Sequence, residues 1–277
     1  MNKNTIIDEL LKSYSVPSSK TKEAAWEKLS IKLQPEKEKI FNVNGFLQIA
    51  AVLVLAVIFA FLADALVFVQ KYSSDFAEQQ IVVLQDDSKV ILNPNSQLKV
   101  NYSFITGKRD LFLKGNALFD VEKGKEFSVK FQGGQVTVLG TRFSVVAYDN
   151  IAPEINCLSG KVKVKAQNEQ KLLTQGEGAV ITNQSEIKKI EVNKEKVLAE
   201  INGSYSWKNE KLEHIFNILE ARFGYSIYAP DEIVNRKFTG TINMKDLEHT
   251  LEVLSFAMEL KYSVNQKNKK VTFENKN

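Results

Sequence analysis

The feature that most constrains the fold is a run of apolar residues in the N-terminal quarter of the chain. Residues 46–69 read FLQIAAVLVLAVIFAFLADALVFV, and only Gln48 and Asp64 interrupt the 24 positions. As a helix this run would measure about 36 Å, which is enough to cross a bilayer with some tilt. A helix packed in a protein core would show a polar face, and this run has none. The sequence therefore predicts a single transmembrane helix over residues 46–69.

A cleaved leader is the alternative to a retained helix, because Ala63-Asp64-Ala65 resembles a signal-peptidase site. A polar stretch of about 45 residues precedes the apolar run, whereas the segment before the apolar part of a signal peptide is short. The sequence thus favours a retained anchor. Asp64 lies near the outer end of the run, where a carboxylate can reach headgroups or water.

Positive charge is uneven on the two sides of the apolar run. The lysines within about 20 residues are Lys28, Lys32, Lys37 and Lys39 on the N-terminal side, and Lys71 and Lys89 on the other. Since positively charged flanks stay in the cytoplasm, we expect a protein of the inner (cytoplasmic) membrane. Its N-terminus would be cytoplasmic and its C-terminal domains periplasmic.

The composition and the rare residue types argue against several classes of function. The 277 residues carry a net charge of +4 that is spread along the chain, so no direct contact with nucleic acid is expected. The single cysteine, Cys157, lies in an apolar stretch typical of a core, and the two histidines, His214 and His249, form no cluster. No nucleotide, metal or nucleophile motif occurs, so the sequence predicts no cofactor, no metal site and no enzyme activity.

The first 44 residues have the pattern of two short amphipathic helices. The apolar positions are Ile6, Ile7, Leu10, Leu11 and Tyr14 in the first, and Ala24, Ala25, Trp26, Leu29 and Leu33 in the second. Helices of this length are marginal alone and must pack on something. We expect this segment to bind a partner, with the membrane surface or a self-packed hairpin as alternatives.

Residues 80–185 are predicted to be all-β. Apolar and other residues alternate in short runs, as in Leu111/Leu113, Phe127/Val129/Phe131 and Val162/Val164. Turn sequences recur roughly every 8–12 residues, which suits a sandwich, a barrel or a β-solenoid. The sequence does not distinguish among these three.

The last part of the chain alternates strands with helices. Residues 186–203 have the charged pattern of a linker helix, and residues 204–277 are predicted to form a small α+β domain. One of its amphipathic helices, LEHIFNILEARF, stops at Gly224, a typical C-terminal cap. The expected architecture is a single-pass membrane protein with a short α-helical N-terminal segment, an all-β domain and a small α+β domain.

The order of several sequence blocks over residues 81–182 resembles a FecR domain, the extracytoplasmic part of transmembrane anti-sigma regulators. The blocks are LQDDSKVILNPNSQLKV, LFLKGNALFDVEKGKEFSV, VTVLGTRFSVVAY, LSGKVKV and LLTQGEGAVI. YSWKNEKLEHIFNILEARFGYSI resembles the C-terminal domain of these regulators, which is similar to the short N-terminal signalling domain of secretins and TonB-dependent transporters. This chain has Asp86-Asp87-Ser88 where the family usually has Asp-Gly-Ser, and Gly115-Asn116-Ala117 for Gly-Glu-Ala. Its N-terminal segment is about half the usual length.

The resemblance implies signal transfer across the inner membrane. The signalling domain of a ligand-loaded TonB-dependent transporter in the outer membrane would meet the periplasmic part of the chain. The N-terminal segment would then release or activate an extracytoplasmic-function sigma factor that controls nutrient or iron uptake genes. Its expected sigma-factor contacts are Leu10, Leu11, Trp26 and Leu29. Cleavage by membrane-site proteases is a simpler route than a shape change conducted through one helix.

The alternation in residues 136–145, VTVLGTRFSV, changes phase at Gly140-Thr141. Glycine permits a bend or bulge, after which Thr141 re-enters a strand. The alternative is self-cleavage, because some members of the family resemble self-cleaving proteins at this bond. There the threonine hydroxyl attacks the preceding carbonyl, and the resulting ester is hydrolysed. The sequence favours the bend.

Two other classes of function remain open. A membrane-anchored binding or scaffold module without sigma control would fit the short N-terminal segment. A hydrolase built on Asp120 with Glu122, or on Glu154, would need a second acid or base nearby. Asp120 and Glu122 alternate with Phe119 and Val121, so we expect them on the solvent face of a strand.

Overall fold

The structure is a computed structural model that describes residue 8 and residues 12–13, 21–32, 43–67, 69–103, 107–167, 169–182 and 184–276. The chain divides into two compact units, Met1–Ile58 and Phe59–Asn277. Helices α2 (Lys22–Lys32) and α3 (Val43–Val67) precede the strands. Within the described ranges, no helix combines the length and the apolar character that crossing a membrane requires.

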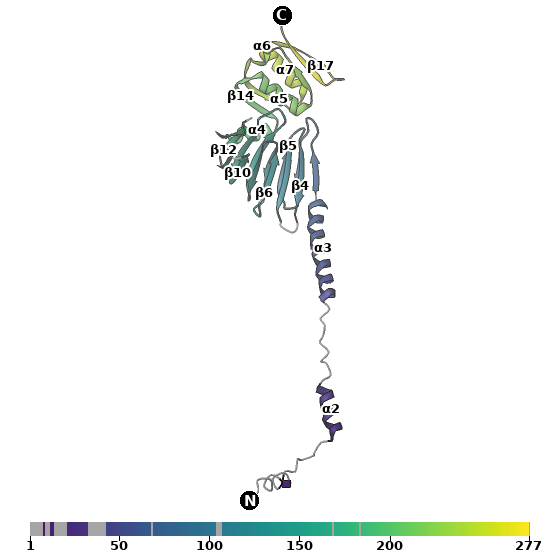
Figure 1. Cartoon of the computed structure of the whole chain (residues 1–277). Coiled ribbons are helices and arrows are strands. Elements are labelled where there is room, and N and C mark those ends of the chain that lie inside the picture. The colour runs from purple at the N-terminus through teal and green to yellow at the C-terminus, as the bar shows by residue number, and fades with distance from the viewer. Residues whose placement is uncertain are drawn as a thin grey trace. The chain divides into compact units, whose positions relative to one another are not determined.

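The all-β domain is a sandwich of thirteen strands (Figure 1). Their bounds are β1 Val69–Ser73, β2 Gln80–Val83, β3 Lys89–Leu92, β4 Gln97–Tyr102, β5 Arg109–Asp120, β6 Phe127–Phe131, β7 Gly134–Val138, β8 Arg142–Ala147, β9 Glu154–Ser159, β10 Lys161–Ala166, β11 Glu169–Thr174, β12 Glu177–Ile181 and β13 Ile187–Glu191. Successive inward residues of both layers meet in one apolar core that includes Phe119, Phe127 and Phe143. Phe119 and Phe143 stack with ring centroids 4.9 Å apart.

Strand β5 belongs to both layers of the sandwich. Its first half pairs with β4 and, in parallel, with β6, while its second half pairs with β3 and β8. The strand bends at Gly115, whose φ is +108° and whose place leaves no room for a side chain, since a Cβ would lie 2.8 Å from Ser96 Cα. The sandwich is thus one sheet folded over at a glycine.

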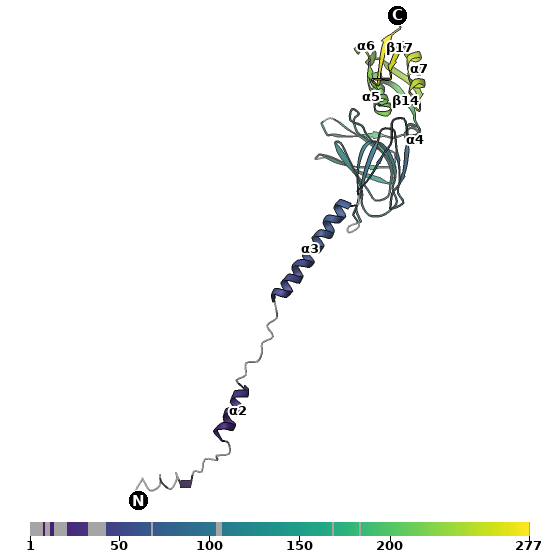
Figure 2. The same cartoon turned by 90° about the vertical axis from the view of Figure 1, so that its right-hand side faces the viewer.

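The small C-terminal domain combines helices α5, α6 and α7 with short strands (Figure 2). Its elements are β14 Ser204–Lys211, α5 Leu212–Phe223, β15 Ser226–Tyr228, α6 Asp231–Val234, β16 Lys237–Asn243, α7 Leu247–Met258, β17 Leu260–Asn265 and β18 Lys270–Asn275. Strand β14 pairs with β16, and the other sheet runs β15-β18-β17. Gly224 ends α5 in the left-handed conformation, as its sequence predicts.

Helix α4 (Lys194–Ile201) connects the two domains and packs on the sandwich. Its inward residues Val197 and Ile201 join Leu118 and Leu158 in a separate apolar cluster. The helix begins at Asn193, whose side chain accepts a hydrogen bond from the amide of Lys196 at 2.9 Å. The segment is therefore part of the packed structure as well as a connection.

The segment between β1 and β2 reaches the C-terminal domain. The Ala77 amide donates to the Arg222 carbonyl at 3.1 Å, and the Gln79 side chain donates to the Ile201 carbonyl. The Phe76 ring lies against Gly224, where a Cβ would overlap it, and Lys269 Nζ sits 4.9 Å from the ring centroid. The first strand of the sandwich thus leads directly into a contact with the C-terminal domain.

The sandwich extends beyond the predicted range of 80–185 at both ends. Strand β1 adds residues 69–73, the first of which was expected at the end of the apolar helix, and pairs with β4. Strand β13 occupies residues 187–191 in the predicted linker 186–203 and pairs with β12. Only one of its five residues, Ile187, is buried, so it lacks the alternation that identifies a strand.

Candidate functional site

The predicted sigma-factor contacts fall on two segments of the N-terminal unit. Leu10 and Leu11 lie outside the described residues. Trp26 and Leu29 lie three positions apart on α2 and share a face of it. Their exposed fractions are 72% and 51%, so both are open to a partner. An exposed tryptophan and leucine at this spacing can enter the apolar groove of another protein.

The Gly140-Thr141 pair forms the corner between β7 and β8. Gly140 has φ +156°, and a Cβ there would lie 2.8 Å from Lys123 Cα. The Leu139 carbonyl accepts from the Gly124 amide at 2.9 Å, and the Thr141 carbonyl accepts from the Val121 amide at 3.1 Å. The segment after β5 therefore holds the corner on both sides, and glycine is needed for this close approach.

The hydroxyl of Thr141 and the carbonyl of Gly140 both lie next to Gly160. A Cβ on Gly160 would lie 2.9 Å from Thr141 Oγ1 and 3.2 Å from the Gly140 oxygen. Thr141 is buried, and its hydroxyl donates to the Lys161 carbonyl at 3.0 Å. A donated hydrogen bond of this kind leaves the oxygen lone pairs available for attack on a carbonyl carbon.

The charged side chains around this corner are mostly basic. They line a cavity of about 680 Å³ and include Lys123, Lys161, Lys163 and the carboxylate Glu126.

The single cysteine, Cys157, is fully buried, and burial together with the charge of Glu177 raises the pKa of its thiol to about 11. Its thiol is therefore protonated at neutral pH and is a core group, as its sequence predicts.

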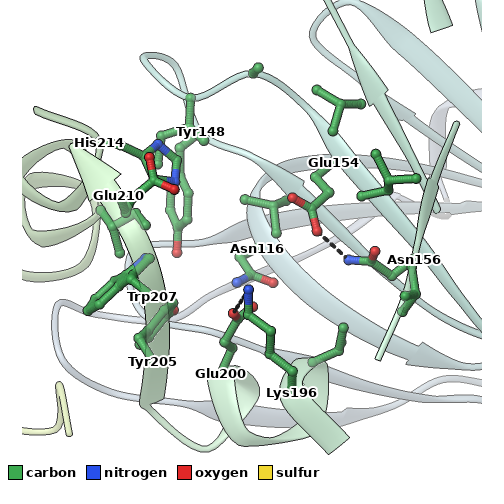
Figure 3. A pocket seen from close by; sticks show the side chains of 18 of the residues that line it. Asn116, Tyr148, Glu154, Asn156, Lys196, Glu200, Tyr205, Trp207, Glu210 and His214 are labelled. Atoms are coloured by element: carbon green, nitrogen blue, oxygen red, sulfur yellow. Dashed lines mark hydrogen bonds and ion pairs between the residues drawn. The ribbon is translucent and has the colours of Figure 1, made fainter. Parts of the chain in front are cut away.

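A second cavity, of about 400 Å³, lies between the sandwich, α4 and the C-terminal domain (Figure 3). The sandwich contributes Asn116 and Glu154, α4 contributes Lys196 and Glu200, and the C-terminal domain contributes Tyr205, Trp207, Glu210 and His214. Burial raises the pKa of Glu200 to about 7, and the charge of Glu154 acts in the same direction, against the opposite effect of Lys196. These residues come from four separate parts of the chain, and no local sequence pattern unites them.

The three carboxylates considered for hydrolysis do not come together as a catalytic pair. Asp120 and Glu122 are exposed, as expected for the solvent face. Glu154 is in the cavity and accepts a hydrogen bond from Asn156 Nδ2 at 2.8 Å. Within the described ranges, no group of three or more potential metal ligands occurs.

Comparison with known proteins identifies both the sandwich and the small C-terminal domain. The family FecR protein matches residues 70–163, and the family FecR, C-terminal matches residues 204–273. No curated protein matches the chain. Two crystal structures of a proposed anti-sigma factor from Parabacteroides distasonis, at 2.50 Å and 1.65 Å resolution, have a similar fold. In both the TM-score is 0.66 and the identity 22%, and the matches cover 75% and 74% of this chain and 99% of the other. With its two matches spanning more than half of its 277 residues, this chain belongs to the FecR family.

Proposed function

We propose that the chain is a transmembrane sigma-factor regulator, an anti-sigma factor that relays a signal from outside the inner membrane. The observation that carries the proposal is the pairing of a FecR sandwich with a FecR C-terminal domain, a fold shared with a proposed anti-sigma factor. Between these domains and the N-terminus lies α3, whose described large apolar side chains are exposed. Exposed apolar side chains over such a length would be covered by lipid.

The proposed arrangement places residues 1–44 in the cytoplasm, residues 46–69 in the inner membrane and the domains that follow in the periplasm. The lysine excess before the apolar run supports this orientation. In the cytoplasm, Trp26 and Leu29, together with Leu10 and Leu11, would bind an extracytoplasmic-function sigma factor. Their exposure on α2 supports the contact for the two described residues.

The proposed input is the signalling domain of a TonB-dependent transporter in the outer membrane. The three-stranded sheet of the C-terminal domain runs β15-β18-β17, so β15 and β17 are its edge strands. An unpaired edge can accept a strand from another protein through main-chain hydrogen bonds, whatever the side chains. Signal transfer would then change the contact between the C-terminal domain and the β1–β2 segment, and site proteases would release the cytoplasmic segment.

Capture of a sigma factor by the full-length chain tests the function. We expect a sigma factor to co-purify with the detergent-extracted chain, and Trp26→Ala or Leu10→Asp to reduce the capture about tenfold or more, as loss of an aromatic anchor does. Ile31→Ala is the matched control, because Ile31 is also exposed, at 64%, but lies on another face of α2. If the wild type captures no sigma factor, the chain is an anchored scaffold module instead.

Self-cleavage at Gly140-Thr141 would be an additional step. Thr141 Oγ1 would form a bond to the Gly140 carbonyl carbon as its proton leaves, and the C–N bond would break to give an ester and the free amine of Thr141. Water would then hydrolyse the ester to the Gly140 carboxylate and the original hydroxyl. Strands β7 and β8 each pair with two other strands, so the two fragments would stay associated.

Mass spectrometry of freshly purified chain measures this cleavage. Cleavage at this bond would give a fragment that starts at Thr141 in the wild type and only intact chain in Thr141→Ala. Thr137→Ala is the control, since Thr137 lines the same cavity but does not follow the glycine. An intact wild-type chain after prolonged incubation would mean that the corner is a bend alone.

A further inference from the structure

The cavity between the sandwich and the C-terminal domain has features of a ligand site that the proposed regulatory function does not use. Both domains and α4 contribute to its wall, so a bound molecule would touch all three. Its volume of about 400 Å³ lies in the range of natural small-molecule pockets.

Asn116 presents a buried acceptor with no partner in this cavity. The residue is only 5% exposed, and its Oδ1 atom has no hydrogen-bond partner among the residues that the structure describes. Its backbone is fixed on both sides, because its amide donates to Ser96 Oγ at 2.9 Å and its carbonyl accepts from that hydroxyl at 3.1 Å. Figure 3 shows the amide group between Glu154 and the Lys196–Glu200 pair. A buried acceptor of this kind costs free energy unless a donor occupies the space beside it.

The charges of the lining favour a positively charged donor. Four carboxylates line the cavity, namely Glu154, Glu191, Glu200 and Glu210, and the single lysine or arginine among the lining residues is Lys196. Lys196 Nζ lies 3.7 Å from Glu200 Oε1, longer than the usual charge-assisted hydrogen bond, and its side chain is 53% exposed. The negative charge inside the cavity is therefore only partly compensated.

An aromatic wall completes the site. Tyr205 and Trp207 are buried side chains of β14 that stack with ring centroids 5.6 Å apart. Aromatic faces attract cations, and tryptophan does so most strongly. The Asn116 acceptor, the carboxylates and the aromatic rings therefore all favour a positively charged ligand.

We propose that this cavity binds the primary ammonium or guanidinium group of a small organic cation, with Asn116, Glu154 and Glu200 as acceptors beside the aromatic residues of β14. The inference goes beyond sigma-factor control and holds whether or not a sigma factor binds. The cation would be a free amine or the side chain of a lysine or arginine in a peptide, since both present the same donors. Bound between the sandwich and the C-terminal domain, it would stabilise their contact.

Tryptophan fluorescence of the full-length chain tests the proposal directly. The chain has two tryptophans, Trp26 and Trp207, so Trp26→Phe leaves a single fluorophore in the wall of the cavity. We expect putrescine or agmatine to change its emission saturably, and glutarate and glucose to leave it unchanged. N-acetyl-arginine methylamide distinguishes the sources, because binding of this probe alone would indicate a peptide side chain.

Two variants of the lining and one outside it complete the test. We expect Glu200→Gln, which keeps the shape of the side chain, and Asn116→Ala each to weaken cation binding by about tenfold or more. Glu252→Gln, on the exposed face of α7 and outside the cavity, should bind as the parent does. The proposal is overturned if no cation changes the emission at 10 mM, if glutarate binds equally well, or if both lining variants bind like the parent.

Discussion

At the scale of single residues, the charge of Glu200 depends on its burial beside the contact between the domains. Burial raises the pKa of Glu200 to about 7, from 4.5 for an ordinary glutamate. The charged and titratable groups that line the cavity with it are Lys196 on its own helix, Tyr148 after β8, Glu154 on β9, Glu191 on β13, Tyr205 and Glu210 on β14, and His214 on α5. The folded chain therefore holds a proton on Glu200 at pH values where the unfolded chain has lost it.

The raised pKa of Glu200 predicts that the free energy of unfolding falls as the pH rises. Because the pKa of Glu200 is raised on folding, its contribution is complete below pH 4.5 and disappears as the pH rises through 7. We expect the free energy of unfolding to fall by about 2–3 kcal/mol between pH 5 and pH 8 on account of this group. Urea unfolding at four pH values measures it, and Glu200→Gln should remove that part of the slope. Parallel curves for the two proteins would contradict the assignment.

At the scale of elements, the β1–β2 segment docks through a glycine that caps a helix. Gly224 and Gly176 both have positive φ, +71° and +84°, but a Cβ on Gly224 would overlap the Phe76 ring while one on Gly176 would meet nothing within 4 Å. Replacing either by alanine strains the backbone by about 1 kcal/mol. A difference between the two variants in the exposure of the β1–β2 segment therefore measures the effect of the contact between Phe76 and Gly224.

We expect Gly224→Ala to expose the β1–β2 segment and Gly176→Ala to leave it protected. Protease cleavage of the native chain within residues 74–79, mapped by mass spectrometry, would rise about tenfold in the first variant only. The reason is that the added methyl group displaces Phe76 and with it the bond from the Ala77 amide to the Arg222 carbonyl. Equal cleavage in both variants would show that Phe76 does not hold this segment.

Sequence alone predicts the elements well where the signal is local. The amphipathic pattern of α5 and its glycine cap are confirmed, and Asp87 takes the positive φ, +64°, that its place in a turn usually gives to glycine. The choice of a sandwich was not predictable, because it depends on pairings such as β5 with β8 that join distant residues. The cavity was missed for the same reason, since Asn116 and Trp207 are 91 positions apart.

At the scale of the whole molecule, the order of the elements along the chain supports a signal that passes from the C-terminal domain to α3 by a single route. The C-terminal domain contacts the β1–β2 segment, and β1 follows α3 in the chain after a single residue. A change at the C-terminal domain can therefore reach the apolar helix through one short strand, which pairs with β4 alone among the described strands. A strand held on one side is the easiest part of a sheet to release.

Transcription from a promoter that depends on the partner sigma factor tests this signal transfer most directly. It should be measured in cells that carry the intact chain, the Trp26→Ala chain, or a chain that ends at residue 203. We predict that Trp26→Ala abolishes the control of transcription and that removal of residues 204–277 makes transcription independent of the inducing signal, with the chain present in the membrane in all three cases. Unchanged, normally induced transcription in both variants would contradict the account.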